Sequence, residues 1–258
     1  MNVVIAFFKR YIQEITRSYF LLFWVLVWPV FWYYLLILLI LPTHGALEPG
    51  ELEVVKVAII LAVAFYSLMS ASLVGLPAGL VEDMERGLVD KYASLGIPLL
   101  GELAGRSLAF AVLAFVGIGF SFIMAQPVAG FRYDTTLGLT LLALFAYGLI
   151  TVFFMGMGLV FAALARRAIE VTVVGLALAN FLPFAAGIFI PPDDLPPILQ
   201  TFTRIFPPSI LFNDAIVPAL LQARSPALVP FASAATACLL LYVIGYGVYF
   251  WSRRQVYC

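Results

Sequence analysis

Residues 81–106 read VEDMERGLVDKYASLGIPLLGELAGR, and the rest of the chain is interpreted from this stretch. It holds eight charged residues, namely Glu82, Asp83, Glu85, Arg86, Asp90, Lys91, Glu102 and Arg106. Long apolar segments flank it on both sides. A charged segment between two membrane spans is expected to lie in water, and this one is too short to form a domain. We therefore expect it to be a surface that contacts another protein.

The composition is that of an integral membrane protein. Of the 258 residues, 64% are hydrophobic and 11% are charged, whereas soluble domains carry about 25% charged residues. The formal net charge is zero, which argues against a nucleic-acid partner. Cys238 lies inside an apolar run and Cys258 is the last residue, so the cysteines predict neither a disulfide framework nor a metal site.

Six charge-free runs are long enough to cross a bilayer, which takes about 20 residues. They are residues 18–47, 57–81, 107–131, 135–165, 171–192 and 225–252. We therefore predict an all-α membrane protein with six transmembrane helices. With both termini in the cytoplasm, the inner segments carry ten Lys and Arg residues and the outer segments carry four. This bias favours that orientation in the plasma or inner cell membrane.

Residues 2–17 predict an amphipathic helix that lies along the inner membrane surface. Lys9, Arg10, Glu14 and Arg17 recur at helical spacing, and apolar side chains form the opposite face. The alternative is a plain cytoplasmic extension of the first span. The separation of the two faces favours the interfacial helix.

The first span, expected at residues 19–41, places aromatic side chains near its middle. Trp28 and Trp32 lie there, although such side chains normally gather at membrane interfaces. They either line a conduit or pack between helices, and the sequence leaves both open. Pro29 is expected to kink this helix.

The second span, expected at residues 57–80, carries a stripe of small side chains. Ser67, Ala71, Gly75 and Gly79 follow one another at four-residue spacing. Small residues on one face let helix backbones approach closely in lipid. We expect this face to pack against other helices.

Residues 82–98 are the expected contact surface. Glu82 and Arg86 are four residues apart on a short helix that Gly87 interrupts. An isolated helix of this length is marginal in water, so a partner is expected to hold it. The expected contact residues are Glu82, Asp83, Glu85, Arg86, Leu88, Asp90, Lys91 and Tyr92. The alternative is that these charges only solvate a loop.

The fifth span is expected to be broken. Asn180 and Pro183 interrupt its apolar run, and three pairs of prolines follow. Residues 198–212 are again mostly apolar, with Arg204 as their one charge. We predict short helices that return into the outer side of the membrane over residues 183–213. Such backbone needs protein or water around it.

The sequence contains no motif that binds nucleotide or cleaves a bond. It has no phosphate-binding loop of the G-x-x-x-x-G-K-[ST] type, no HExxH and no GxSxG. No charged residue is predicted in the middle of a span, so an internal ion relay is poorly supported. We expect a chain that is not an enzyme, holds no cofactor and takes its energy from a partner.

The sequence resembles the permease subunits of ABC-2 type exporters over essentially its whole length. The stretches that carry the resemblance are FLLFWVLVWPVFWYYLL at 20–36, EDMERGLVDKYASLGIPLLGELAGRSL at 82–108 and NFLPFAAGIFIPPDDLPPILQTFTRIFP at 180–207. Val89 replaces the small polar residue that is usual after Gly87–Leu88, and Ala186 stands where serine is common. The motifs are most similar to the drug and antibiotic exporter branch.

The resemblance implies a single six-span domain over residues 1–258 that pairs with a second copy or a paralogue. Two cytoplasmic ATPase subunits would hold the ATP and Mg²⁺ and move the permease through residues 2–17 and 82–98. The first and fifth spans would frame the substrate path, and residues 183–213 would form an outer re-entrant gate. Candidate path or gate residues are Trp28, Trp32, Phe181, Pro183, Phe184 and Phe189.

Two other classes of function stay open at this stage. A secondary transporter would carry its own coupling-ion site, for which buried charges or an inverted repeat would be the signal. A membrane assembly or regulatory protein would transport nothing. Membrane lipid is an expected partner of the chain. A neighbouring reading frame for an ATPase with a phosphate-binding loop would distinguish the exporter from both.

Overall fold

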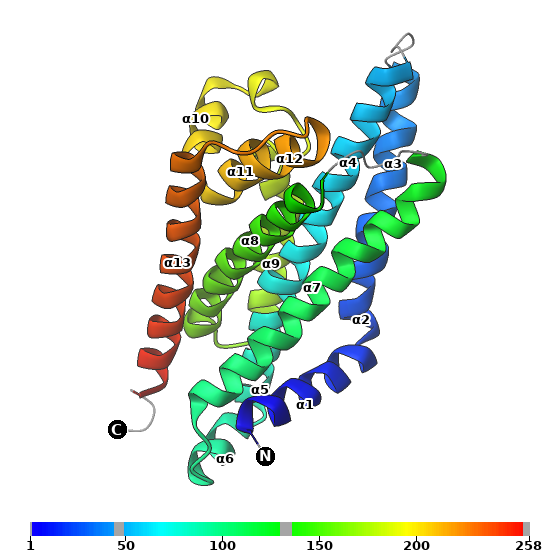
Figure 1. The fold of residues 1–258 in the computed structure, drawn as a ribbon. Coiled ribbons are helices and arrows are strands. Elements are labelled where there is room, and N and C mark those ends of the chain that lie inside the picture. The colour runs from blue at the N-terminus through cyan, green and yellow to red at the C-terminus, as the bar shows by residue number, and fades with distance from the viewer. Residues whose placement is uncertain (1, 44–48, 130–135, 255–258) are drawn as a thin grey trace.

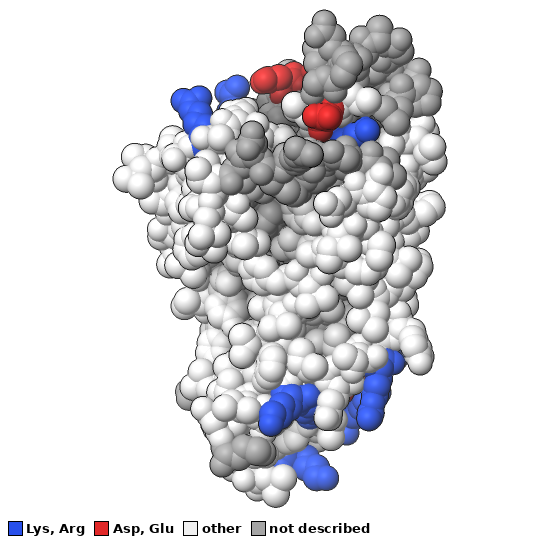
Figure 2. All heavy atoms as spheres, turned by 45° about the vertical axis from the view of Figure 1, so that its right-hand side comes forward, with Lys and Arg blue, Asp and Glu red and all other residues white. Residues whose placement is uncertain are grey.

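The computed structural model describes residues 2–43, 49–129 and 136–254, and every regular element within them is helical. Among these residues, six helices are long and apolar enough to cross a membrane: Tyr19–Leu39, Leu52–Glu85, Leu99–Pro127, Leu137–Leu164, Ala168–Ala185 and Leu228–Ser252. Figure 2 shows charged side chains at the two ends of the molecule and a wide uncharged band between them. The all-α fold with six spans is therefore confirmed, and the chain is a multi-pass membrane protein.

Two of the six spans are built from more than one helical element. The first consists of α2 (Tyr19–Leu22), the π-helical segment η1 (Phe23–Val27) and α3 (Trp28–Thr43). The second consists of α4 (Pro49–Met69), the π-helical segment η2 (Ser70–Gly75) and α5 (Leu76–Glu85). The remaining spans are α7 (Leu99–Ala129), α8 (Leu137–Leu164), α9 (Ala168–Ala185) and α13 (Leu228–Arg254).

The second span forms the centre of the bundle (Figure 1). Of its most apolar window 94% is buried, compared with 17% to 44% for the other spans. The predicted stripe of small residues allows this packing. A Cβ atom on Gly75 would lie 2.6 Å from the Phe110 ring and 2.7 Å from Leu21. A larger residue at position 75 would have to displace the Phe110 ring of the third span and the Leu21 side chain of the first.

Each π-helical segment of the described chain ends two residues before a proline. The segment η1 precedes Pro29, η2 precedes Pro77, and η4 (Phe212–Ile216) precedes Pro218. Proline lacks an N–H group and its ring collides with the carbonyl four residues earlier. A wider turn that contains this carbonyl relieves the collision, so the helix continues through the proline. Where the sequence predicted a kink at Pro29, the helix has a widened π-helical turn just before the proline.

The N-terminal helix α1 (Val3–Arg17) crosses the lower end of the bundle against α7 (Figure 1). Asn2 caps it by accepting a hydrogen bond from the Val4 amide at 3.1 Å. The predicted amphipathic helix is confirmed. Its apolar face does not serve lipid alone, however, because Phe7, Tyr11 and Ile15 are buried against the other helices.

The fifth span breaks later than the sequence predicted. The helix α9 runs through Pro183 to Ala185, and the chain turns at Gly187, whose φ is +71°. The predicted interruption at Asn180 and Pro183 is therefore wrong. The Asn180 amide donates to the Leu176 carbonyl of its own helix at 2.7 Å, so it does not interrupt the helix.

Short helices follow α9 and pack back into the upper end of the bundle. They are η3 (Pro192–Asp194), α10 (Pro197–Ile205), α11 (Pro207–Leu211), η4 and α12 (Val217–Leu221). Leu211, Ile216 and Ala219 are fully buried, and the Phe212 ring lies 5.7 Å from that of Phe65 in α4. This arrangement fits the predicted return of short helices after the fifth span.

Candidate functional site

The charged stretch covers the end of the second span, a short helix and the start of the third span. The second span continues to Glu85, and Gly87 then adopts a left-handed conformation with φ +68°. The short helix α6 (Leu88–Ser94) follows, and Gly96, also at φ +68°, leads into α7. The prediction that Glu82 and Arg86 lie on a separate short helix is wrong, because these residues belong to the end of the second span.

Three of the eight charged residues are buried, contrary to the expectation that the whole stretch lies in water. Asp83 is 4% exposed, and Glu102 and Arg106 are each 1% exposed. The Arg106 guanidinium forms ion pairs with both carboxylates, through Nη2 to Asp83 and at 3.0 Å to Glu102 Oε1. These residues come from α5 and α7, so the pairs tie the second span to the third.

The N-terminal helix joins this group through Tyr11 and Arg10. The Tyr11 hydroxyl donates to Glu102 Oε1 at 2.7 Å and accepts from Arg106 Nη2 at 2.5 Å. The Arg106 guanidinium also lies 3.9 Å from the centre of the Tyr11 ring. Arg10 Nη2 pairs with Asp83 Oδ1 at 3.3 Å. We call Arg10, Tyr11, Asp83, Glu102 and Arg106 the buried ion cluster.

The buried ion cluster is electrically balanced, with two carboxylates against two guanidinium groups. Burial raises the pKa of Tyr11, which keeps the phenol neutral and able to donate its proton. Burial alone would lower the pKa of Arg10, but Tyr11, Glu14 and Asp83 raise it. A buried charge is costly without its partner, so α1, α5 and α7 are held in one arrangement.

Asp83 does not belong to the expected contact surface, because it is buried in this cluster. The other expected contact residues remain accessible: Glu82, Glu85, Arg86, Asp90 and Lys91 are exposed, and Leu88 and Tyr92 are half-buried. Tyr92 packs edge-on against Phe7 of α1, with ring centroids 5.2 Å apart. It therefore ties α6 to α1 and offers only part of its surface to a partner.

Two exposed apolar residues that the sequence did not single out lie next to this expected surface. Leu95 and Leu100 are 65% and 63% exposed although they are apolar. They flank the Gly96 turn, where neither α6 nor α7 covers them. A glycine followed by a proline at position 98 was the available signal for such a turn.

Glu82 and Glu85 have partners within the chain. Glu82 pairs with Arg86, and both side chains are at least half exposed. Glu85 Oε1 accepts a hydrogen bond from the Ala168 amide at 3.1 Å, which is the first residue of α9. The charged stretch thus contacts the start of the fifth span as well as α1.

The residues expected on the polar face of α1 fall into two groups. Lys9, Glu14 and Arg17 are exposed, as predicted for a face in water. Arg10 is half-buried and bridges Glu14, at 2.8 Å, and Asp83. The polar face therefore has an internal contact that the sequence did not indicate.

The expected path residues form an aromatic cluster between the first and fifth spans. The Trp32 ring lies 6.1 Å from Phe184 and 6.3 Å from Phe189, and those two rings are 4.9 Å apart. Trp28 contacts Trp32 at 6.2 Å. Phe181 does not join them, because it is 75% exposed on the opposite side of α9 from buried Pro183.

A polar contact lies beside this aromatic cluster. The Tyr66 hydroxyl of α4 donates to the Asn180 side-chain oxygen of α9 at 3.3 Å. Tyr66 is 1% exposed, so the bond forms inside the bundle. The first, second and fifth spans therefore meet at mid-height through aromatic and uncharged polar side chains.

Comparison with known protein families finds a match that covers most of this chain. The family described as ABC-2 type transporter matches residues 2–217, which include α1, five of the six spans and the short helices up to η4. A search among curated proteins found no match.

Proposed function

This chain belongs to the ABC-2 type transporter family and is a permease subunit of an ABC transporter, and we propose that it exports its substrate. In this proposal a separate cytoplasmic ATPase holds the ATP and Mg²⁺ and supplies the energy. The permease itself is not catalytic and pairs with a second copy or a paralogue. Both of its termini lie in the cytoplasm.

The observation that carries this proposal is the buried ion cluster. It joins α1, the end of the second span and the start of the third span directly above α6. An ATPase that moved α6 or α1 would therefore move the ends of two spans together, because separating them would strand buried charges. Glu85 extends this connection to the start of the fifth span.

The surface proposed for ATPase contact is α6 with the turn after it. It presents Lys91 and the exposed apolar side chain of Leu95, flanked by Glu82 on α5 and by Arg86 directly after that helix. Leu95 is 65% exposed, so it can add apolar contact area to the charged side chains when a partner covers this surface. The short length of α6, seven residues, also requires neighbours to keep it folded.

The path is proposed to run beside the aromatic cluster of Trp28, Trp32, Phe184 and Phe189. These side chains couple the first span to the segment that follows α9. The short helices over residues 183–213 would then gate its outer end. The drug and antibiotic branch of exporters is the proposed subgroup, since such a path suits apolar substrates.

A secondary transporter is less well supported. In the described part of the chain, the buried charged side chains are Asp83, Glu102 and Arg106, and they pair with one another near one end of the bundle. A coupling-ion site would place carboxylates near the middle of the spans.

Double substitution of Lys91→Glu with Leu95→Asp tests the docking surface. Neither side chain is part of the buried ion cluster, so the variant is expected to fold and insert like wild type. We expect it to lose co-purification of the ATPase and ATP-driven export. The matched control is Arg166→Glu, a charge reversal at an exposed position outside α6.

The outcome is read from pull-down of the tagged permease and from transport in inverted vesicles. Wild-type ATPase binding and wild-type export by the double variant would together refute docking at α6. Loss of binding by the Arg166→Glu control to the same extent would show that charge, and not this surface, governs the association.

A further inference from the structure

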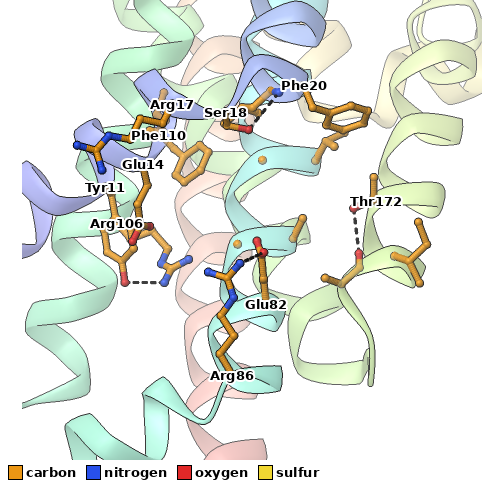
Figure 3. Close-up of a pocket in the computed structure, with 18 residues that line it drawn as sticks. Tyr11, Glu14, Arg17, Ser18, Phe20, Glu82, Arg86, Arg106, Phe110 and Thr172 are labelled. Atoms are coloured by element: carbon orange, nitrogen blue, oxygen red, sulfur yellow. Dashed lines mark hydrogen bonds and ion pairs between the residues drawn. The ribbon is translucent and has the colours of Figure 1, made fainter.

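A cavity of about 690 Å³ opens at the α1 end of the bundle (Figure 3). It lies between α1 and α2 on one side and α5 and the start of α9 on the other. Its apolar wall includes Phe20, Leu21, Val74, Phe110 and Ile169. Its charged side chains are Glu14, Arg17, Glu82, Arg86 and Arg106. The cavity therefore suits a ligand with a polar head and an apolar body.

Arg106 lines this cavity, and some of its N–H groups donate no hydrogen bond to a described residue. All of its hydrogen bonds to described residues run through Nη2, and Nε is buried without a partner among them. Nη1 lies next to Gly79, where an added Cβ atom would come within 2.9 Å of it. Arg106 is 1% exposed overall, but Gly79 also lines the cavity and carries no side chain that would cover Nη1 at this part of the wall.

Arg17 supplies a second cation at the rim. It is exposed, and it forms no ion pair with any residue that the structure describes. The two acidic side chains of the cavity are already engaged, Glu14 with Arg10 and Glu82 with Arg86. Since the charge of Arg106 is balanced by Asp83 and Glu102, the unused capacity of the site is the spare N–H donors of Arg106 and the charge of Arg17.

The apolar part of the wall is open toward the surface of the spans. Phe20 of α2 is 55% exposed and Ile169 of α9 is 63% exposed, on opposite sides of the cavity. Both helices belong to membrane spans, so hydrocarbon chains of lipid can reach this opening from the side. A ligand that enters here can keep its chains in the bilayer.

We propose that this cavity binds the phosphate headgroup of a phospholipid from the leaflet at the α1 end of the bundle. The phosphate oxygens accept hydrogen bonds from Arg106, and Arg17 adds a charge at the rim. The acyl chains lie along Phe20 and Ile169. The inference stands apart from the proposed direction of transport, because it concerns a lipid held by the resting permease.

Binding is tested on the purified full chain in detergent, by native mass spectrometry with three probes. These are dioleoyl phosphatidylglycerol, dioleoylglycerol, which has the same chains without phosphate, and inorganic phosphate. We expect retention of the phospholipid and no retention of dioleoylglycerol. Equal retention of the two lipids overturns the proposal, because the phosphate is then not recognised. Inorganic phosphate that displaces the lipid completely shows a free-anion site and also overturns it.

Two variants place the lipid in this cavity. Arg17→Gln removes the rim charge and is expected to weaken binding by up to about fivefold, the upper limit for a single exposed ion pair. Ala78→Leu narrows the cavity without removing a charge and is expected to reduce retention further. Arg166→Gln is the matched control, since it removes an exposed charge outside the cavity. Wild-type retention by both cavity variants overturns the assignment of the site.

Discussion

Replacing Asp83 with asparagine removes one charge of the buried ion cluster and keeps the shape of the side chain. Arg106 would then pair only with Glu102, and Arg10 only with Glu14. Removing one partner of a buried ion pair costs about 3–5 kcal/mol. Because Glu102 Oε1 still lies 3.0 Å from Arg106, we expect the lower end of this range, about 3 kcal/mol.

The effect is measured as thermal unfolding of the purified chain in detergent. For a chain of this size, about 3 kcal/mol lowers the midpoint by about 6–12 °C. The neighbouring Glu82→Gln is the matched control, because it removes the same charge from an exposed side chain. Surface substitutions of this kind stay within about 0.5 kcal/mol.

A double variant tests whether Asp83 and Arg106 stabilise the fold through their contact or independently of each other. If Asp83 and Arg106 stabilise the fold through their contact, Asp83→Asn combined with Arg106→Gln costs less than the sum of the single variants. Additive costs would show that the two side chains act independently. Equal midpoint shifts for Asp83→Asn and Glu82→Gln would refute the claim that the cluster holds α1, α5 and α7 together.

Three other outcomes follow from the structure. Gly156→Leu is expected to destabilise the chain by about 1–3 kcal/mol, since a Cβ there would lie 2.8 Å from the backbone of α13. Gly119→Leu, with nothing within 4 Å, is its control, and equal unfolding midpoints would contradict close packing of α8 on α13. Cysteine at Asp194 should react with an impermeant thiol reagent from outside the cell, and cysteine at Asp90 only after permeabilisation; the reverse pattern would invert the topology. The purified permease should hydrolyse no ATP by itself, and turnover in a preparation free of partner would refute a separate motor.

The spans could be predicted from sequence because each depends on a local property. A charge-free run of sufficient length is visible without knowing its neighbours, and six such runs gave the six helices. The two faces of residues 2–17 likewise predicted α1. The stripe of small side chains on the second span also predicted a packing surface, and Leu21 and Phe110 pack closely against Gly75.

The buried ion cluster could not be predicted from spacing. Sequence separations of four residues revealed Glu82 with Arg86 and Glu102 with Arg106, and both pairs form. Asp83 differs from Glu82 by one position, and a helix turns about 100° over one residue. Its partners Arg10 and Arg106 are 73 and 23 residues away in the chain. Only the crossing of α1 over α5 and α7 brings them together.

The extent of α9 was misjudged because proline was weighed as a helix breaker. Pro183 removes only its own N–H from the hydrogen bonds of α9, so the helix continues past it, and the chain turns at Gly187. The second span was expected to end at residue 80, but its helix continues to Glu85. Glu82 and Arg86 were consequently assigned to a separate short helix.

Because of the wide turn η2, the number of residues in the second span can change without changing the direction in which the side chains of α5 point. A π-helical turn holds one residue more than an α-helical turn over the same advance. A chain with one residue fewer between Ser70 and Gly75 would close this turn and still aim Asp83 at Arg106. The same deletion within α4 would rotate everything below it by about 100° and carry Asp83 out of the cluster. A length change that leaves the α5 and α7 ends joined is therefore expected only at the widened turn.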